Sequence, residues 1–282
     1  MINKIMKNNG IKAYQEDLKR IDLSKIDKTI QEEKNISYID DNTEEHKLDI
    51  YYKKTNNKKP ILINIHGGGF ISSYKELDYL FCNNMAQKEF VVFNINYRLA
   101  YPKYNVFDQI DDVSNAVKRI IENAKEYEGN TEEMYIVGHS AGAVLATIEA
   151  MLCNDEQMKK DYNVERNYNY KGLILDCGVM HLYKKSFAYW GMRNMIFPKG
   201  YKNTNKYKHL IFENKKLSLP KTLLITNEKD ELKEMTYYFK DILDKNNINN
   251  KLINKNNEGH MGIIFNPNNE IINEITNYFK EN

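Results

Sequence analysis

The stretch that decides the fold is Met134-Tyr135-Ile136-Val137-Gly138-His139-Ser140-Ala141-Gly142-Ala143. Its first four residues form a short apolar run, which is typical of a strand buried on both faces. A tight turn of small residues follows, and the apolar segment Ala141–Cys153 after it has the character of a helix. A serine between a strand and a helix in a G-x-S-x-G pattern indicates a nucleophile that the turn lifts clear of the sheet. We therefore predict that Ser140 is a catalytic nucleophile beside a helix N-terminus that favours negative charge; the alternative is a structural turn serine.

Short apolar runs alternate with helical patterns on both sides of this stretch. Strands are predicted at Ile61–Ile65, Phe90–Asn96, Met134–Val137, Gly172–Leu175 and Thr222–Thr226, with a weaker one at Lys251–Asn254. Helices are predicted at Tyr74–Lys88, Phe107–Glu126, Ala141–Cys153, Leu232–Asp244 and Pro267–Lys280. Such alternation indicates an α/β fold with a mostly parallel sheet and helices on both faces. Before it, Ile36–Asp40 and Lys47–Lys53 predict an antiparallel hairpin at one edge of the sheet.

Two segments depart from this alternation. Apolar residues at helical spacing between Ile11 and Ile21 predict a helix or arm within residues 11–34, so we assign residues 1–35 to an N-terminal helical arm that either stands alone or joins a cap. Residues 180–219 are aromatic, basic and irregular, and the segment is too long for a simple crossover between two strands. We expect this insertion to be a lid, within one domain that spans residues 36–282.

A second motif, His66-Gly67-Gly68-Gly69-Phe70, directly follows the strand predicted at Ile61–Ile65. Consecutive glycines leave their backbone N–H groups unobstructed, so that a ligand oxygen can approach closely. Acyl transfer creates a tetrahedral oxyanion that needs such preplaced donors. We predict an oxyanion hole made by the N–H groups of Gly68, Gly69 and Ala141. The alternatives, a flexible glycine turn or a phosphate loop, lack the Lys-Ser/Thr and the glycine spacing of nucleotide-binding loops.

Three motifs in order carry a family resemblance: His66–Phe70, then Asn96-Tyr97-Arg98-Leu99-Ala100-Tyr101-Pro102, then Gly138–Ala143. Over about residues 48–279, the chain resembles α/β-hydrolases of the hormone-sensitive-lipase-like esterase group. The resemblance implies the α/β-hydrolase fold and an oxyanion hole formed by the glycine motif. The chain differs from that family at Ala100-Tyr101-Pro102, where Ala-Pro-Glu is common, and at His139, where Asp is common. Histidine at the latter position also occurs in related acyl hydrolases, including arylformamidases and small acetylesterases.

The general base and the acid are expected in the C-terminal part of the chain. A serine is weakly nucleophilic until a base takes its proton, and an adjacent carboxylate orients that base. The resemblance implies the chain order serine, acid, histidine. His260 lies in the loop 257–262 before the last helix, where the fold places the base, and Asp230 matches the family position of the acid. Other carboxylates at or near strand ends remain alternatives for the acid: Glu228, Glu231 and Asp176.

Residues next to these motifs have supporting assignments. We expect His66 and Gly67 to support the oxyanion loop, and a substrate pocket to be lined by Phe70, His139 and Trp190. Structural roles are expected for Tyr97, Arg98, Asp111 and Asp112, with Arg98 paired to a carboxylate of the following helix.

Composition restricts the class of protein. A net charge of +2, from 41 Lys and Arg against 39 Asp and Glu, gives no electrostatic case for nucleic acid as a partner. No run approaches about 18 apolar residues, so we expect no membrane span, and the N-terminus lacks the apolar core of a secretory signal. Without paired cysteines or His-x-x-x-His, we expect neither a metal nor a cofactor. Three cysteines in apolar surroundings predict a reducing, cytoplasmic location; a homodimer is left open.

These features predict a serine hydrolase that cleaves small to medium acyl esters through an acyl-enzyme, with a small-molecule ester as its partner. The chain length of the acyl group is inferred from the absence of an obvious apolar surface helix. One alternative is the same triad acting on a formamide or another amide, as in arylformamidases. The other is a catalytically inactive hydrolase fold that binds a ligand or a protein, although all three triad positions are occupied.

Overall fold

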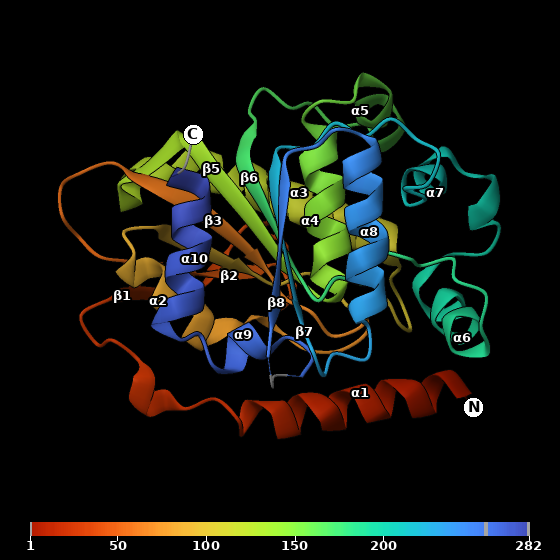
Figure 1. The fold of residues 1–282 in the computed structure, drawn as a ribbon, viewed down its shortest axis with the longest axis horizontal. Coiled ribbons are helices and arrows are strands. Elements are labelled where there is room, and N and C mark those ends of the chain that lie inside the picture. Colours follow the sequence, from red (N-terminus) through yellow and green to blue (C-terminus); the bar gives the residue numbers. More distant parts are fainter. Residues whose placement is uncertain (1, 257–258, 281–282) are drawn as a thin grey trace.

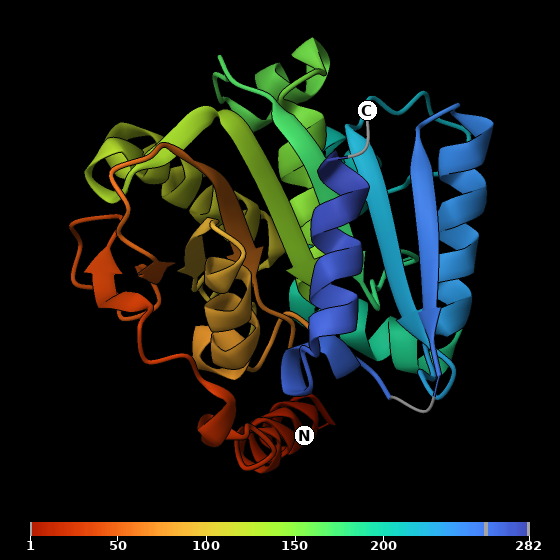
Figure 2. The same ribbon diagram turned by 60° about the vertical axis from the view of Figure 1, so that its left-hand side comes forward.

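An eight-stranded sheet forms the centre of the computed structural model, which describes residues 2–256 and 259–280 (Figures 1 and 2). The first two residues of the loop 257–262 therefore lie outside the described residues. The strand order is β1-β2-β4-β3-β5-β6-β7-β8. The bounds are β1 Gln31–Ser37, β2 Lys47–Tyr52, β3 Lys59–Ile65, β4 Val91–Ile95, β5 Gly129–His139, β6 Tyr170–Asp176, β7 Lys221–Asn227 and β8 Asn250–Lys255. Strand β2 pairs antiparallel with β1 and β4, and all other pairs are parallel, as predicted.

Helices cover both faces of this sheet, which explains the continuous apolar runs in its strands. Ile61, Ile63 and Ile65 of β3 point into one core, and Leu62 between them points into the other. Helices α3, α4 and α8 pack on the first core and α2, α9 and α10 on the second. Their bounds are α2 Tyr79–Gln87, α3 Val106–Asn123, α4 Ala141–Leu152, α8 Lys233–Lys245, α9 Gly262–Phe265 and α10 Asn269–Lys280. A strand buried on both faces has no polar alternation.

The N-terminal region differs from the sequence prediction in its bounds. The first helix, α1, spans Ile2–Leu18 rather than residues 11–34, and only the short 3-10 helix η1 at Leu23–Lys25 follows it. Strand β1 begins at Gln31, five residues before the predicted start, and pairs Ser37 with Lys47. This strand lies at the edge of the sheet with most of its side chains exposed, so its polar sequence carries no apolar pattern.

Residues 180–219 contain short helices where the sequence indicated irregular structure. These are α6 Phe187–Ile196, the 3-10 helix η4 Tyr201–Asn203 and α7 Asn205–His209; a further short helix, α5 Glu156–Tyr162, precedes β6. Figure 1 shows α1 running along one end of the molecule, with α6 beside its N-terminal half. Tyr14 of α1 packs on Tyr74 with ring centroids 5.6 Å apart. Because Tyr74 lies in the segment that follows the carboxyl end of β3, this end of the molecule is the one at which the parallel strands end.

Candidate active site

Ser140 lies in a sharp turn between β5 and α4. Its φ of 51° and ψ of −112° place it in a sparsely populated backbone region, which costs about 1–3 kcal/mol for a residue other than glycine. A hydrogen bond from its N–H to the carbonyl of Asp176, at 2.8 Å, holds the turn against β6. A Cβ at Gly138 would lie 2.3 Å from the Gly142 carbonyl oxygen, and one at Gly142 would lie 2.3 Å from the Ile65 carbonyl oxygen. Both flanking glycines are therefore required by backbone packing.

The structure brings Ser140, His260 and Asp230 together. His260 Nε2 is 2.8 Å from Ser140 Oγ, and His260 Nδ1 is 2.8 Å from Asp230 Oδ1. The Asp230 side chain is fully buried, whereas 31% of the His260 side chain is exposed. A carboxylate that accepts the Nδ1–H leaves Nε2 unprotonated and able to take the proton of the hydroxyl. This arrangement can activate a serine for attack on an acyl carbon.

Hydrogen bonds keep the Asp230 carboxylate ionised in spite of its burial. Burial raises the pKa of Asp230, but hydrogen bonds from His260 and from the N–H of Leu232 outweigh it, and the pKa is lowered from its ordinary value. The Leu232 N–H lies 2.9 Å from Oδ1, the same oxygen that faces His260. Thr226 Oγ1 donates to the other oxygen at 3.4 Å.

Two of the competing carboxylates have other partners, and the third is exposed. Glu228 accepts a hydrogen bond from Asn254 Nδ2 at 2.8 Å, and Glu231 is exposed. Asp176 lies 2.9 Å from the ring of His139. Of the four carboxylates considered, Asp230 is the one placed against His260.

Cys177 and Asn227, neither of which is a site residue predicted from the sequence, also contact the loop that carries His260. Asn227 Nδ2 donates to the Gly259 carbonyl at 2.8 Å, and the N–H of Met261 lies 3.3 Å from Cys177 Sγ. Asn227 Nδ2 also lies 3.4 Å from that sulfur. Both residues stand at the carboxyl ends of neighbouring strands, which is the sequence signal that could have found them.

One group within residues 2–256 and 259–280 has the composition of a metal site. It consists of Cys177, Asp230 and His260, whose ligand atoms lie within 4.8 Å of one another. Burial raises the pKa of the Cys177 thiol, whereas a metal requires the thiolate. All three side chains already make hydrogen bonds, so we interpret the group as a hydrogen-bonded cluster rather than as a metal site.

The glycine loop lies directly against the nucleophile. A Cβ built at Gly67 would be 3.2 Å from the Cβ of Ser140. Gly68 and Gly69 have φ values of 101° and 60°, and a Cβ at Gly68 would lie 1.9 Å from a backbone oxygen. Within the described part of the chain, no acceptor is hydrogen-bonded to the N–H of Gly68, Gly69 or Ala141. These three N–H groups are therefore available to a ligand oxygen.

His66 and Tyr97 bind the backbone of this loop through hydrogen bonds to its carbonyl groups. The two rings are stacked with centroids 4.1 Å apart, and His66 is fully buried. His66 Nδ1–H donates to the Gly67 carbonyl at 2.8 Å, and the Tyr97 hydroxyl donates to the His66 carbonyl at 2.8 Å. Burial lowers the pKa of His66 to about 3, so the ring is neutral. These contacts are those expected of a residue that supports the loop.

His139, predicted to line a substrate pocket, lies instead in the core. Its Nδ1 is 2.9 Å from Asp176 Oδ2, and its Nε2 is 3.0 Å from Asn64 Oδ1. Burial lowers the pKa of His139, but the carboxylates of Asp78 and Asp176 outweigh it, and the pKa is raised. With both nitrogens engaged and no exposed surface, the ring has no contact to offer a substrate.

The other two predicted pocket residues lie in opposite environments. Phe70 is fully buried, whereas Trp190 is 53% exposed on α6.

The predicted pairing of Arg98 with the following helix is confirmed, since its Nη2 lies 2.6 Å from Asp112 Oδ1.

Comparisons with known proteins give the following matches. The profile of the family described as BD-FAE matches residues 48–210. A probable isoprenylcysteine alpha-carbonyl methylesterase of Oryza sativa is 26% identical over 156 residues, which cover 50% of this chain and 36% of that protein. The versiconal hemiacetal acetate esterase of Dothistroma septosporum is 34% identical over 106 residues, covering 36% of this chain and 31% of that protein. The chain thus spans about a third of the length of these curated relatives.

Solved esterase structures share the fold over nearly the whole chain. Esterase B from Lactobacillus rhamnosis superposes with a TM-score of 0.87 at 18% identity, covering 99% of this chain and 95% of that one. An esterase of Pyrobaculum calidifontis gives a TM-score of 0.76 at 18% identity, with coverages of 99% and 93%. The predicted α/β-hydrolase fold is therefore confirmed. Among the helices that the structure describes, none combines the length and apolar character needed to cross a membrane.

Proposed function

The chain belongs to the BD-FAE family, and on that basis we propose that it is a serine hydrolase of carboxylic esters. The observation that carries the proposal is the chain of 2.8 Å contacts from Asp230 through His260 to Ser140. Relatives that carry esterase names, over the part of the chain that they match, support the same reaction class.

The proposed reaction uses only groups of this chain. Ser140 Oγ attacks the acyl carbon while His260 Nε2 takes its proton, and Asp230 stabilises the imidazolium that forms. The oxyanion of the tetrahedral intermediate accepts hydrogen bonds from the loop glycines Gly68 and Gly69 and from Ala141. His260 then returns the proton to the leaving alcohol. Water activated by the same imidazole releases the acid from the acyl-enzyme.

We propose small to medium acyl chains as substrates. The formamide alternative rested on histidine in place of aspartate before the nucleophile. Because His139 is fully buried and bonded to Asp176 and Asn64, that difference acts within the core rather than on a substrate. Ester hydrolysis is therefore the reaction to test first.

The test is hydrolysis of p-nitrophenyl acetate, butyrate and decanoate by the wild type and by Ser140→Ala. We expect turnover that falls from butyrate to decanoate and is lost in Ser140→Ala, while a Ser24→Ala control on the exposed surface retains it. A fluorophosphonate should label the wild type and the control but not Ser140→Ala. Folded wild-type protein that neither turns over any of the three esters nor reacts with the probe would refute the proposal.

Three further predictions accompany this function. The segment 180–219 with α6 is proposed as a lid, together with α1. A cytoplasmic location rests on three cysteines that are all buried and unpaired. Homodimer formation stays a prediction to be measured in solution.

A further inference from the structure

Positive charge is concentrated in two segments of this nearly neutral chain. Residues 2–15 and 177–212 contain ten of the 41 Lys and Arg and none of the 39 Asp and Glu. The rest of the chain therefore has 31 basic residues against 39 acidic ones. The first segment forms most of α1 and the second contains α6, and these two helices are in contact. We call the surface of residues 2–15 and 177–212 the cationic edge.

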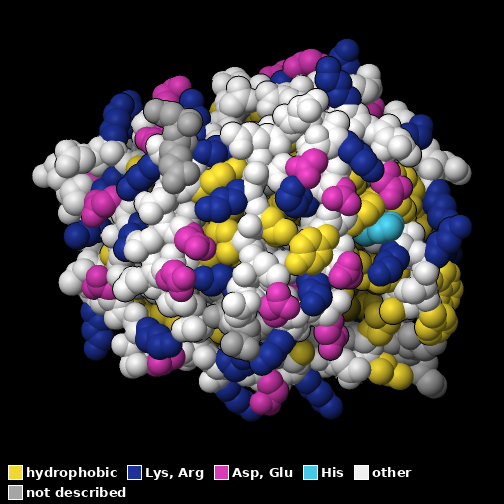
Figure 3. Space-filling model, viewed as in Figure 1, with side chains coloured by type: hydrophobic (Ala, Val, Ile, Leu, Met, Phe, Trp, Pro, Cys, Tyr) yellow, Lys and Arg dark blue, Asp and Glu magenta, His cyan; other side chains and the backbone are white. Residues whose placement is uncertain are grey.

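Exposed large apolar side chains gather on the same side of the molecule. Within the described residues, all five of them lie in α1, η1 or α6: Ile5, Ile11, Leu23, Phe187 and Trp190. Phe187 is 74% exposed, and its ring stacks on that of Trp190 with centroids 5.7 Å apart. Figure 3 shows hydrophobic side chains gathered over α6 next to Lys and Arg. No apolar surface helix is expected from the sequence, whereas α6 exposes Phe187 and Trp190.

Within the described residues, the exposed lysines of the cationic edge have no acidic partners. Of its lysines in the second segment, Lys206 is the one that lies near a carboxylate of the described ranges, 3.9 Å from Asp111. No carboxylate in the described ranges forms an ion pair with the exposed ones, which are Lys184, Lys185, Lys199, Lys202 and Lys208. Their charges are therefore available to an anionic partner.

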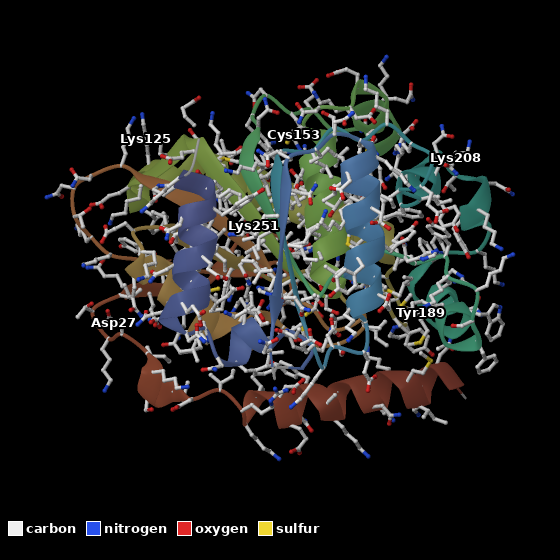
Figure 4. The ribbon with its side chains drawn as sticks, viewed as in Figure 1. Asp27, Lys125, Cys153, Tyr189, Lys208 and Lys251 are labelled. Atoms are coloured by element: carbon white, nitrogen blue, oxygen red, sulfur yellow. The ribbon has the colours of Figure 1, made fainter. Side chains whose placement is uncertain are left out.

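The cationic edge borders the proposed active site. Tyr189 of α6, labelled in Figure 4, donates its hydroxyl hydrogen to Met235 Sδ at 3.6 Å. Met235 lies five residues beyond Asp230. On the other side, Lys7 of α1 donates to the Tyr101 carbonyl at 2.7 Å. Gly10 of α1 lies against Ser72, whose hydroxyl donates to the Gly68 carbonyl at 2.9 Å. A molecule bound at this edge therefore lies next to the glycine loop and to the start of α8, which follows Asp230.

We propose that the cationic edge docks on an anionic lipid surface and that the site hydrolyses amphiphilic esters of small to medium acyl groups held there; the second part rests on the proposed function. Lysines are attracted to anionic headgroups, and exposed aromatic rings such as those of Phe187 and Trp190 insert at headgroup level. Neither signal alone anchors a protein stably, but the two together do. A second copy of the chain is a poor occupant, because a symmetric contact would bring lysines against lysines. A nucleic acid would leave the exposed aliphatic side chains of α1 without a partner.

Sedimentation of the full chain with vesicles tests the docking without reference to activity. We expect binding to vesicles of phosphatidylcholine and phosphatidylglycerol in equal parts, little binding to phosphatidylcholine alone, and weakening as salt screens the charges. The triple variant Lys184→Gln, Lys185→Gln, Lys202→Gln should bind about 100-fold more weakly, at about fivefold per lysine. The matched control Lys118→Gln, Lys125→Gln, Lys160→Gln changes three exposed lysines outside the cationic edge and should bind as the wild type does. Phe187→Ser with Trp190→Ser should also weaken binding.

Specific results would overturn the docking proposal. These are equal binding to both kinds of vesicle, an equal loss in the control variant, or tighter binding of a single-stranded oligonucleotide than of vesicles. A dimer in solution that Phe187→Ser with Trp190→Ser converts to a monomer would assign the face to a second copy instead. Turnover of soluble p-nitrophenyl acetate by the matched control, whose three lysines lie outside the segment 180–219, should equal that of the wild type. Turnover without docking refutes this inference alone, and docking without turnover refutes the proposed function alone.

Discussion

Replacing Asp230 by asparagine separates the position of the acid from its charge. Oδ1 accepts hydrogen bonds from both His260 Nδ1–H, at 2.8 Å, and the Leu232 N–H, at 2.9 Å. In Asp230→Asn, the Leu232 N–H favours the amide oxygen at this position. The amide nitrogen then takes the place of Oδ2, where Thr226 Oγ1 is able to accept. We therefore expect His260 to keep the tautomer that the reaction needs.

The expected loss of rate follows from the charge alone. Where asparagine reverses the tautomer of a catalytic histidine, kcat falls by about 10⁴. Two unit charges about 4 Å apart at an effective dielectric constant of about 20 interact by about 4 kcal/mol, or about 10³ in rate. Solvent around the partly exposed His260 reduces this interaction. We expect kcat of Asp230→Asn to fall by about 10²- to 10³-fold.

The assay is kcat for p-nitrophenyl acetate at saturating substrate, with circular dichroism to establish folding. Asp230→Ala is the comparison, because it removes the acceptor and leaves both N–H groups without a partner. It should lose at least about ten times more activity than Asp230→Asn. If the two variants are equally inactive, or if asparagine lowers kcat by about 10⁴ or more, the Leu232 N–H does not control the orientation of the amide and the reasoning is refuted.

Three further predictions concern the surroundings of the triad. His139→Ala leaves buried carboxylates without their partner and should lower the free energy of unfolding in urea by about 3–5 kcal/mol. Burial lowers the pKa of His139, but the carboxylates of Asp78 and Asp176 raise it by more, so the net pKa is raised. Its stabilisation is therefore complete below about pH 6.5 and is lost as the pH rises through the folded-state pKa; wild-type and variant stabilities that fall in parallel would count against this. Gly68→Ala would place its Cβ 1.9 Å from a backbone oxygen and should prevent native folding. Gly69→Ala meets no atom within 4 Å, so its free energy of unfolding should fall by only about 1–2 kcal/mol; equal melting temperatures of the two variants would contradict the packing argument. Asn227→Ala removes the 2.8 Å hydrogen bond to Gly259 in the loop that positions His260, and should lower kcat by about 10- to 100-fold with KM nearly unchanged. A rise in KM without a fall in kcat would contradict this role.

Local patterns in the sequence were sufficient for the sheet and the nucleophile. Strands β3 to β7 appear as short apolar runs because they are buried on both faces, and each predicted run lies within or close to the observed strand. The edge strand β8, with one buried residue, gives a weaker pattern. The G-x-S-x-G turn could be recognised because its glycines are required by close backbone contacts within a few residues and with one neighbouring strand. Where a segment is polar and exposed, as in β1, no such pattern exists, and its bounds were misplaced.

Contacts between distant strand ends were decided by the tertiary structure alone. The sequence placed His139 beside the nucleophile, but only its contacts with Asn64 and Asp176, 75 and 37 residues away, showed that it faces the core. The contact between Asn227 and Cys177 joins residues 50 apart and has no local signature. Parallel strands carry their carboxyl ends to one edge of the sheet, so residues far apart in the chain meet there. The sequence by itself determined which residue types stand at that edge, and the packing of the strands decided which of them touch.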